Sequence, residues 1–419
     1  MTKYAVRAVF AALCSVLAAV GVSGCGGGST GGAGPFAAGD VPQAFNATLK
    51  QHGGTISISG KGHNSALDNY VVAFMNANQV ANAELAVSTK GKVVFSHAYT
   101  YKSIAHSTTT TKTIMRLASN SKAWVDAALY DLISDGKVNP KAKVFAYLGL
   151  TKPLPAGATV DPRVKTITIE DMILHESGWD DTVSPYYDPT FNMRTIATTL
   201  GLKKVVSQSD YVRYQLTQPL QEAPGTTYAY CNFCYTVLGM VIAKASHMTF
   251  GQYLATHVAG PLHVKNVELS PTVGKPLPNE VATYYAPQTG LSAVYITSNK
   301  QYPYPYSGDS MALEVAGGAS AVATNAESML ALMNKYIIWG VGTPQPGADW
   351  AREGSMPGTN SWAEQLPNGT NFSFVVNTRQ YIYGSTPNAF TDLQTQFEQQ
   401  LDPGLSPELV HHFRDGTPR

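Results

Sequence analysis

Charged residues are scarce in this 419-residue chain, and neither sign of charge dominates. Asp, Glu, Lys and Arg together make up 14% of the residues, and the formal net charge is +1. The sequence has no arginine-rich run, basic face or acidic tail. A nucleic-acid-binding surface needs clustered Lys and Arg side chains. Nucleic acid is therefore not expected among the partners of this protein.

Cysteine is also rare, with four residues in the whole chain. Cys14 lies in an apolar N-terminal segment and Cys25 just beyond it, which leaves Cys231 and Cys234 as a C-x-x-C pair. One such pair lacks the other two ligands of a structural zinc site. Three interpretations of the pair stay open: a disulfide that braces its loop, two reduced and packed thiols, or a redox or metal role.

The apolar run at residues 9–22 is short for a membrane span, and Lys3 and Arg7 precede it. Positive charge, a short apolar stretch and then small residues are typical of a secretory signal. We therefore expect an exported protein.

The end of this segment, Val22-Ser23-Gly24-Cys25, resembles the lipobox of bacterial lipoproteins. The resemblance implies a signal peptide at residues 1–24 and a lipid on Cys25; an ordinary signal peptide is the alternative. Gly26, rather than Asp, follows the cysteine, which in that family's sorting rule suggests retention in the outer membrane. The expected location is the periplasmic side of the bacterial cell envelope, with membrane contact only through the lipid anchor.

Composition separates a folded domain from two flanking segments. Residues 25–60 are rich in Gly, Pro, Ala and Asn, which predicts a flexible linker. Residues 404–419 form a polar tail. The folded domain is expected between them, at residues 61–403.

Predicted strands gather near both ends of this domain, and predicted helices lie in its middle. The first α/β part covers about 61–115, the helical part about 116–339, and the second α/β part about 340–403. Asn368-Gly369 is a strong hairpin signal in the second α/β part. This order predicts an antiparallel sheet built from both chain ends, flanked by helices, with an inserted and mainly helical lobe.

Ser119 and Lys122 form an S-x-x-K tetrad at the start of a predicted helix. Apolar residues recur with helical spacing from Lys122 to Ile133, and Asp135-Gly136 follows. The serine and lysine side chains are therefore expected one turn apart on one face of the helix. A serine near a helix N-terminus and a lysine in an apolar pocket can form a nucleophile and its base.

Tyr230 and Asn232 lie two residues apart on a short loop before another predicted helix. Both could point into one cavity, with Cys231 turned away. Tyr230 as a phenolate could take a proton from Ser119 and return it to a leaving group. Asn232 could orient the lysine or bind substrate. The alternative is a buried aromatic residue followed by a helix N-cap.

Arg352-Glu353-Gly354-Ser355 precedes the predicted C-terminal hairpin, so this segment is expected on or beside a sheet edge. The backbone N–H of Ser355 could complete an oxyanion hole with that of Ser119. Arg352 and Gly354 are further candidates for contact with substrate. The alternative is a surface turn with a solvated Arg–Glu pair.

Together these motifs resemble the serine β-lactamase-like superfamily, which contains class C β-lactamases, D-alanyl-D-alanine carboxypeptidases, D-aminopeptidases and related esterases. The resemblance runs from about Asp68 to Gln400. It rests on the nucleophile segment 116–122, the Y-x-N motif 230–232, the K-T-G or H-x-G position 352–354, Leu174-His175-Glu176-Ser177-Gly178 and Ala316-Gly317-Gly318.

This resemblance implies an α/β fold of the α+β, β-lactamase/transpeptidase-like type and a serine hydrolase that works through a Ser119 acyl-enzyme. It implies that Lys122 and Tyr230 handle the proton of Ser119, and that Asn232 helps to hold substrate and lysine. His175 is expected to stabilise a turn. No metal or organic cofactor is implied, because the nucleophile, the base and the oxyanion donors all come from the chain.

The third motif departs from the family pattern, because Arg352 replaces the usual lysine or histidine and Glu353 follows it. Arginine could still hold a substrate carboxylate, but an adjacent carboxylate would oppose it unless Glu353 points outward. We therefore expect an esterase-like hydrolase with a small-molecule or peptide-like acyl substrate. The alternatives are a β-lactamase, a D-Ala-D-Ala carboxypeptidase or a D-aminopeptidase, and, in another class, a non-catalytic envelope lipoprotein that only binds.

Overall fold

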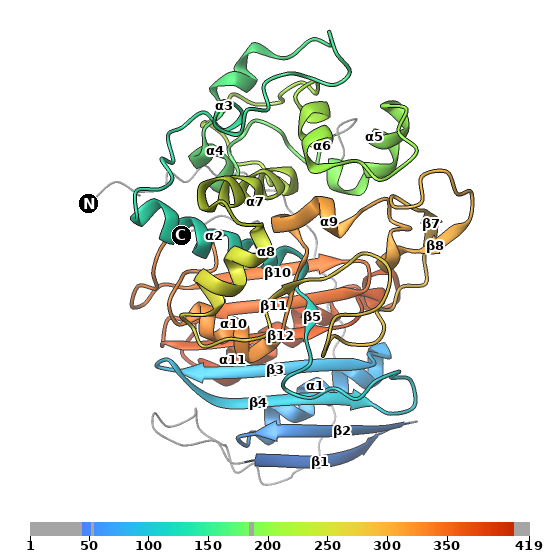
Figure 1. Ribbon diagram of the computed structural model, residues 1–419. Coiled ribbons are helices and arrows are strands. Elements are labelled where there is room, and N and C mark those ends of the chain that lie inside the picture. Colours follow the sequence, from blue (N-terminus) through green and yellow to red (C-terminus); the bar gives the residue numbers. More distant parts are fainter. Residues whose placement is uncertain (1–43, 52–53, 184–187, 406–419) are drawn as a thin grey trace, which may run out of the picture.

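The computed structural model describes residues 44–51, 54–183 and 188–405. Its largest element is a seven-stranded antiparallel sheet with the order β1-β2-β4-β3-β12-β11-β10 (Figure 1). Strands β3 and β12 pair at its centre and join the two ends of the chain, which confirms the predicted sheet. The strands of this sheet are β1 (Ala44–Gln51), β2 (Gly54–Lys61), β3 (Asn82–Thr89), β4 (Lys92–Tyr101), β10 (Trp350–Met356), β11 (Thr359–Gln365) and β12 (Thr370–Val376).

Strands β1 and β2 correct part of the predicted linker at residues 25–60. They pair with each other over their full length, and β2 pairs with β4. Ile56 and Ile58 in β2 are buried, whereas the residues on either side of them are partly exposed. This alternation is typical of a half-buried strand, but the polar and glycine-rich sequence around it concealed the signal. The predicted signal peptide, Cys25 and the first part of the linker lie outside the described residues, as does most of the predicted tail.

Helices cover both faces of the sheet (Figure 1). On one face, α1 (Ser65–Asn78) and α11 (Ala389–Leu401) pack together over β3 and β12. Their apolar side chains, among them Val71 and Phe397, share one core with Phe374 of β12.

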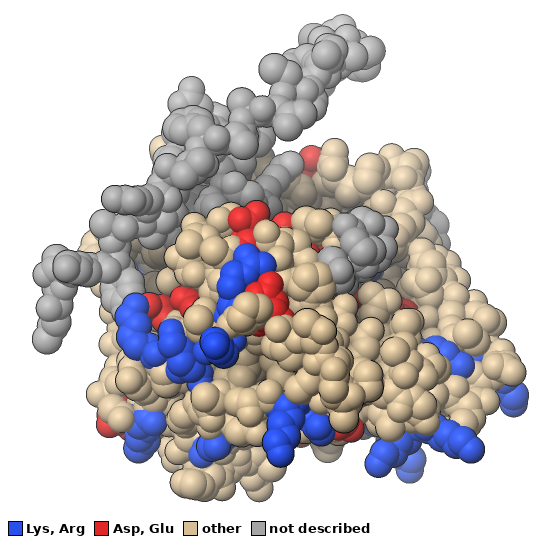
Figure 2. All heavy atoms as spheres, turned by 90° about the horizontal axis from the view of Figure 1, so that it is seen from above, with Lys and Arg blue, Asp and Glu red and all other residues tan. Residues whose placement is uncertain are grey.

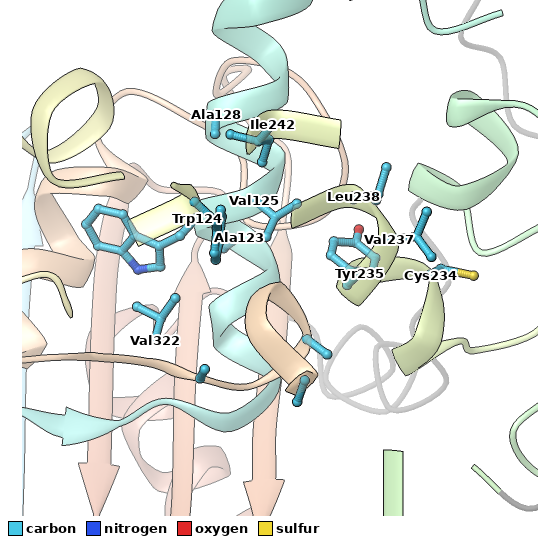
Figure 3. Packing of buried hydrophobic residues seen from close by; sticks show 14 of the residues in the cluster. Ala123, Trp124, Val125, Ala128, Cys234, Tyr235, Val237, Leu238, Ile242 and Val322 are labelled. Carbon is cyan, nitrogen blue, oxygen red and sulfur yellow. The ribbon is translucent and has the colours of Figure 1, made fainter. Parts of the chain in front are cut away.

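The other face of the sheet carries the helical lobe. A second core fills it, in which side chains of α2 and α7 pack against each other and against Val322 (Figure 3). The lobe contains α2 (Ser121–Ser134), α3 (Val144–Leu148), α4 (Ile169–Ile173), α5 (Met193–Thr199), α6 (Gln208–Gln215), α7 (Asn232–Ser246), α8 (Phe250–Tyr253), α9 (Leu313–Ala316) and α10 (Ala326–Met333). It also contains the short strands β5 (Met115–Arg116), β6 (Glu268–Leu269), β7 (Thr289–Leu291), β8 (Gln301–Pro303) and β9 (Val322–Thr324).

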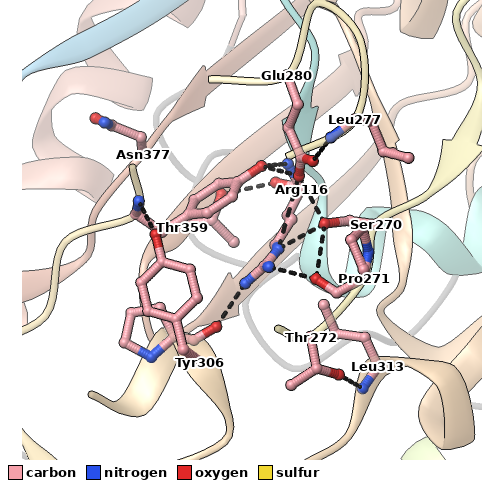
Figure 4. A network of polar contacts seen from close by, with 12 residues as sticks. Arg116, Ser270, Pro271, Thr272, Leu277, Glu280, Tyr306, Leu313, Thr359 and Asn377 are labelled. Carbon is pink, nitrogen blue, oxygen red and sulfur yellow. Dashed lines mark hydrogen bonds and ion pairs between the residues drawn. The ribbon is translucent and has the colours of Figure 1, made fainter. Parts of the chain in front are cut away.

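A buried arginine fastens β5, the strand that leads to the nucleophile (Figure 4). The guanidinium of Arg116 donates to Ser270 Oγ at 2.8 Å and to the carbonyls of Pro271 and Pro305 at 2.7 and 2.6 Å. It also lies over the ring of Tyr284, 4.2 Å from the centroid. Because these partners satisfy all its charge-bearing nitrogens, Arg116 positions the strand and is not available to a substrate.

Charged side chains on the surface form no continuous patch of one sign on the face seen in Figure 2. Lys and Arg lie there in separate groups, with Asp and Glu near several of them. Among the described residues, no helix is both long and apolar enough to cross a membrane.

Candidate active site

Ser119 lies in a short 3-10 turn, Ala118–Asn120, between β5 and α2. The backbone of Ala118 has a φ of 48°, a left-handed conformation that costs a residue with a Cβ about 1–2 kcal/mol. Strain of this kind persists where the surroundings hold the backbone firmly, and it is common at functional sites. The turn leaves Ser119 half-buried at the start of α2, close to where the sequence predicts a helix N-terminus.

Asn120 and Gly354 join this turn to β10. Asn120 Nδ2 donates to the carbonyl of Arg352 at 3.2 Å and to Ser361 Oγ at 2.9 Å. A Cβ at position 354 would lie 2.0 Å from the carbonyl oxygen of Leu117. Position 354 therefore requires glycine, because no side chain fits between the strand and the nucleophile turn. The third motif is thus placed beside Ser119.

Lys122 is fully buried and contacts the nucleophile. Its Nζ lies 2.9 Å from Ser119 Oγ, 2.6 Å from Asn232 Oδ1 and 2.9 Å from the carbonyl oxygen of Ala319. Burial, assisted by the positive charge of Arg352, lowers the pKa of Lys122 to about 7. Near neutral pH a large fraction of the amine is therefore unprotonated, as a general base requires.

Tyr230 contacts Ser119 from another side. Its hydroxyl donates a hydrogen bond to Ser119 Oγ at 2.7 Å. Burial raises the pKa of Tyr230 well above its usual range. The predicted phenolate is thus disfavoured, because the apolar surroundings that lower the pKa of the lysine raise that of the phenol. In this geometry Lys122 Nζ can accept a proton from Ser119, and the Tyr230 hydroxyl donates to the same oxygen.

Asn232 is the first residue of α7 rather than part of the loop before it. Its Nδ2 donates to Asp188 Oδ2 and its backbone N–H donates to Asp181 Oδ2, each at 2.6 Å. With Nδ2 held by Asp188, the amide oxygen faces Lys122. Burial raises the pKa of both carboxyl groups, and the charge of Asp188 raises that of Asp181 further.

Sequence reasoning missed these two aspartates. Both lie in the irregular segment between α4 and α5, where no periodicity indicates which side chains point inward. A possible signal was the number of carboxylates shortly after the His175 motif, in Trp179-Asp180-Asp181.

A disulfide joins Cys231 to Cys234, so the first of the three interpretations of this pair is confirmed. Both cysteines are fully buried. The cross-link spans the first turn of α7, and Cys231 is also its N-cap. The backbone between Tyr230 and the helix is therefore fixed covalently.

His175 supports the same segment from behind. Its Nδ1 accepts a hydrogen bond from the backbone N–H of Cys231 at 3.0 Å, and its ring stacks on Tyr230 with centroids 4.8 Å apart. Burial, together with the charges of Arg352 and Lys122, lowers the pKa of His175 well below its usual range. These contacts agree with the structural role expected for this histidine.

Arg352 requires a correction, because the predicted substrate contact is not possible. Its side chain is buried beside α2, where Nη2 lies 3.1 Å from Asp126 Oδ2 and Nε donates to the carbonyl of Ile338 at 2.6 Å. The guanidinium also lies 4.1 Å from the ring centroid of Trp339. The sequence gives no indication of this partner, because Asp126 lies on a helix more than 200 residues earlier.

Glu353 and Ser355 face the opposite side of β10 from Arg352. Glu353 is exposed and accepts a hydrogen bond from Asn360 Nδ2 at 2.8 Å. Ser355 is half-buried, and its Oγ accepts one from Arg379 Nη1 at 3.3 Å. Arg379 was also missed; it follows β12 in a segment without a recognisable motif. Because β10 is the edge strand of the sheet, some of its backbone N–H groups have no strand partner.

The described residues contain no group of three or more His, Cys, Asp and Glu side chains that could hold a metal ion. The amine of Lys122 and the phenol of Tyr230 contact Ser119 directly. The amide of Asn232 bonds to the amine, and the carboxyl group of Asp188 bonds to that amide. Such a set can accept a proton, return it and orient an attacking hydroxyl.

The sheet with its helical lobe, and a serine and a buried lysine between them, define a serine hydrolase of the β-lactamase and penicillin-binding-protein type. The chain belongs to the Beta-lactamase family, whose sequence model matches residues 67–412. This match confirms the family resemblance that the motifs indicate.

Individual relatives are distant. A "Putative D-alanyl-D-alanine carboxypeptidase" from Salmonella paratyphi A is 27% identical over 176 residues, which is 41% of this chain and 38% of the relative. The chain thus matches well under half the length of such curated relatives.

Solved structures support the fold. A D-amino acid amidase from Ochrobactrum anthropi SV3 has a TM-score of 0.59 at 14% identity, covering 82% of this chain and 100% of the amidase. A D-stereospecific amidohydrolase from Streptomyces sp. has a TM-score of 0.54 at 16% identity, again over 82% and 100%. At these identities the likeness concerns architecture alone.

Proposed function

We propose that this protein is an esterase-like serine hydrolase in which Ser119 is acylated and Lys122 is the general base. The observation that carries the proposal is the pair of contacts on one oxygen: Lys122 Nζ at 2.9 Å and Tyr230 Oη at 2.7 Å from Ser119 Oγ. An oxygen between a proton acceptor and a proton donor can be activated and later reprotonated without large movement.

The unprotonated form of Lys122 fits its three partners. Its two N–H groups donate to Asn232 Oδ1 and to the carbonyl of Ala319, which leaves the lone pair directed at Ser119. The serine proton passes to Nζ as Oγ attacks the substrate carbonyl carbon. Tyr230 then protonates the departing group and regains a proton from Lys122. Water attacks the acyl-enzyme by the reverse sequence and releases the acid.

The negative oxygen formed on attack needs nearby donors. The backbone N–H of Ser119, in the turn before α2, is one candidate, and that of Ser355 on the edge strand is the other. Two such donors stabilise the tetrahedral intermediate by several kcal/mol, with one typically contributing about 3–4 kcal/mol. Gly354 supports this arrangement, since only glycine lets β10 approach the nucleophile turn so closely.

The preference for neutral esters rests on Arg352. Because its guanidinium is buried against Asp126, the third motif presents no side-chain cation to a substrate carboxylate. Glu353, the next residue, is exposed and faces the opposite side of β10 from Arg352. A substrate carboxylate at this position would therefore find no side-chain partner in the third motif.

Arg379 favours a second candidate, a peptidase that recognises a substrate carboxylate. Its guanidinium lies beside Ser355, and its Nε is buried without a hydrogen-bond partner among the described residues. A carboxylate that approached along β10 could pair with it. The name of the curated Salmonella relatives also points to this activity.

A substrate panel separates the two candidates. We would compare a p-nitrophenyl butyrate, a chromogenic cephalosporin, D-phenylalanine amide and an N-acylated D-Ala-D-Ala peptide, with Ser119→Ala as the background. The proposal predicts that the ester is hydrolysed fastest, equally by wild type and Arg379→Met. Peptide or cephalosporin turnover that exceeds ester turnover and is lost in Arg379→Met would establish the second candidate instead. Failure of a fluorophosphonate to label wild type at Ser119 would favour a protein that only binds.

We also propose that the enzyme works as a lipoprotein at the periplasmic side of the cell envelope. The disulfide between Cys231 and Cys234 supports an oxidising compartment, and the segment before Cys25 supports lipidation. Wild type should then fractionate with membranes, and Cys25→Ser should appear in the soluble fraction. Equal distribution of the two proteins would refute the anchor.

A further inference from the structure

A small cavity lies in the helical lobe, beside the segment between α4 and α5 that contains Asp181. Its volume is about 190 Å³, and residues from the segment after α4, from α5 and from α6 line it. Part of the wall is apolar, made by Trp179, Pro189 and Ile196. Another part is polar, made by Asp180, Asp181 and Gln215 among others.

Two polar side chains in this wall have unused hydrogen-bonding capacity. Gln215 is 5% exposed, and its side-chain amide bonds to none of the described residues. Asp181 uses Oδ2 to accept from Asn232, whereas its Oδ1 has no partner in the described part of the chain. A ligand that bonded to both groups would add hydrogen bonds that the described residues do not supply.

The wall of the cavity is also acidic. Asp180 and Asp181 both line it, and no Lys, Arg or His is among the described residues of the lining. Asp188 lies close enough for its charge to act on Asp181. Carboxylates crowded in this way are stabilised by a cation, and the apolar side of the wall suits a short hydrocarbon chain better than a bare ion.

We propose that this cavity binds a small organic cation, a primary alkylammonium group or a molecule that carries one. Asp181 Oδ1 is the counter-ion, the amide oxygen of Gln215 accepts a second N–H, and the alkyl part lies against Trp179 and Ile196. This site is distinct from the substrate site, because none of Ser119, Lys122 and Tyr230 is among the residues that line the cavity.

Calorimetric titration of the full chain with propylammonium chloride tests the proposal, with potassium chloride as the ionic-strength control. Saturable binding is expected for wild type. Gln215→Leu, which removes the polar acceptor at similar volume, should weaken the affinity about tenfold. Gln399→Leu is the matched control, since Gln399 is an exposed glutamine on α11, and should bind like wild type.

Two outcomes would overturn the proposal: no saturable binding to wild type, or equal affinity in wild type and Gln215→Leu. If Gln215→Leu fails to fold, Thr195→Trp fills the cavity from its exposed rim and should abolish binding. Ester hydrolysis measured on the same preparations reports on Ser119 separately. Loss of one property without the other therefore distinguishes failure of the cavity site from failure of the proposed hydrolase function.

Discussion

The two walls of the active site are built in different ways. The helical wall, at the start of α7, contributes the side chains of Tyr230 and Asn232, and a disulfide and two aspartates fasten it. The sheet wall, β10, contributes close backbone contact at Gly354, while its arginine is buried as an ion pair. The chemistry of the site therefore depends on one wall and its shape on the other. Replacing the polar side chains around Ser119 should therefore affect mainly the rate, and replacing the buried arginine of the sheet wall should affect mainly the stability.

The largest effect on activity is expected for Lys122, which lies between the two walls. Lys122→Met keeps an unbranched side chain in the pocket but removes the amine. The loss of a general base should lower kcat/KM for p-nitrophenyl butyrate by about 10²–10⁴-fold, with an unchanged circular dichroism spectrum. Lys137→Met is the control, since Lys137 is exposed. A rate equal to wild type would show that another group takes the serine proton.

The next largest effect is expected on stability, when Arg352 in the sheet wall is replaced. Arg352→Met leaves the buried Asp126 without its cationic partner, which should lower the free energy of unfolding by about 3–5 kcal/mol. Urea denaturation measures this change. Arg352→Met combined with Asp126→Asn should recover much of the loss, because no isolated charge then remains. A stable single variant with impaired substrate binding would instead restore the predicted contact of Arg352 with substrate.

The sequence predicts the helical wall far better than the sheet wall. Ser119 and Lys122 are separated by one helical turn and Tyr230 and Asn232 by one residue, so local geometry brings each pair together. The direction of Arg352 depends on a partner in α2, which no local pattern reveals. The ionisation of Tyr230 depends on burial by the whole lobe, which disfavours the phenolate and which no local pattern reveals.

In the fold, too, local sequence patterns predict some elements, whereas contacts between distant segments determine others. The hairpin at Asn368-Gly369 follows from turn chemistry, and the structure contains it. Strands β1 and β2 were assigned to a linker, because two isoleucines are too few apolar residues to stand out among Gly, Ser and Thr. Their position depends on pairing with β4, a contact across the sheet.

The activity should depend on pH through the protonation of Lys122, which lies between the two walls. The pKa of Lys122 is lowered to about 7, so the free base is abundant above this pH and scarce below it. We expect kcat/KM to fall as the pH drops through 7, and to approach about a tenfold loss per pH unit. At pH 5 the activity should be about a hundredfold below its plateau. A flat profile between pH 5 and 8 would contradict the assignment of this base.

The disulfide tests how firmly the helical wall must be held. Replacement of both Cys231 and Cys234 by serine keeps an N-cap acceptor for α7 but removes the cross-link. For so short a loop the unfolding free energy should fall by about 2 kcal/mol. Thermal denaturation and ester hydrolysis would be measured together. An unchanged melting temperature would mean that the packing of α7 alone fixes this wall.

The smallest effect on activity is expected for Asp188, which accepts a hydrogen bond from the side chain of Asn232. The charge of Asp188 raises the pKa of Lys122, so Asp188→Asn should shift the acid limb of the pH–rate profile to lower pH. Asp392→Asn is the control, since Asp392 is exposed on α11. A shift to higher pH would show that Asp188 does not act through charge.

The most direct test of the account is the mass of the intact protein during turnover of a slow ester. The account predicts a single acyl group on wild type that maps to the peptide containing Ser119. It also predicts no acyl group on Ser119→Ala and much slower accumulation on Lys122→Met. An acyl group on any other residue, or ester hydrolysis by Ser119→Ala at the wild-type rate, would contradict the assignment of Ser119 as the nucleophile.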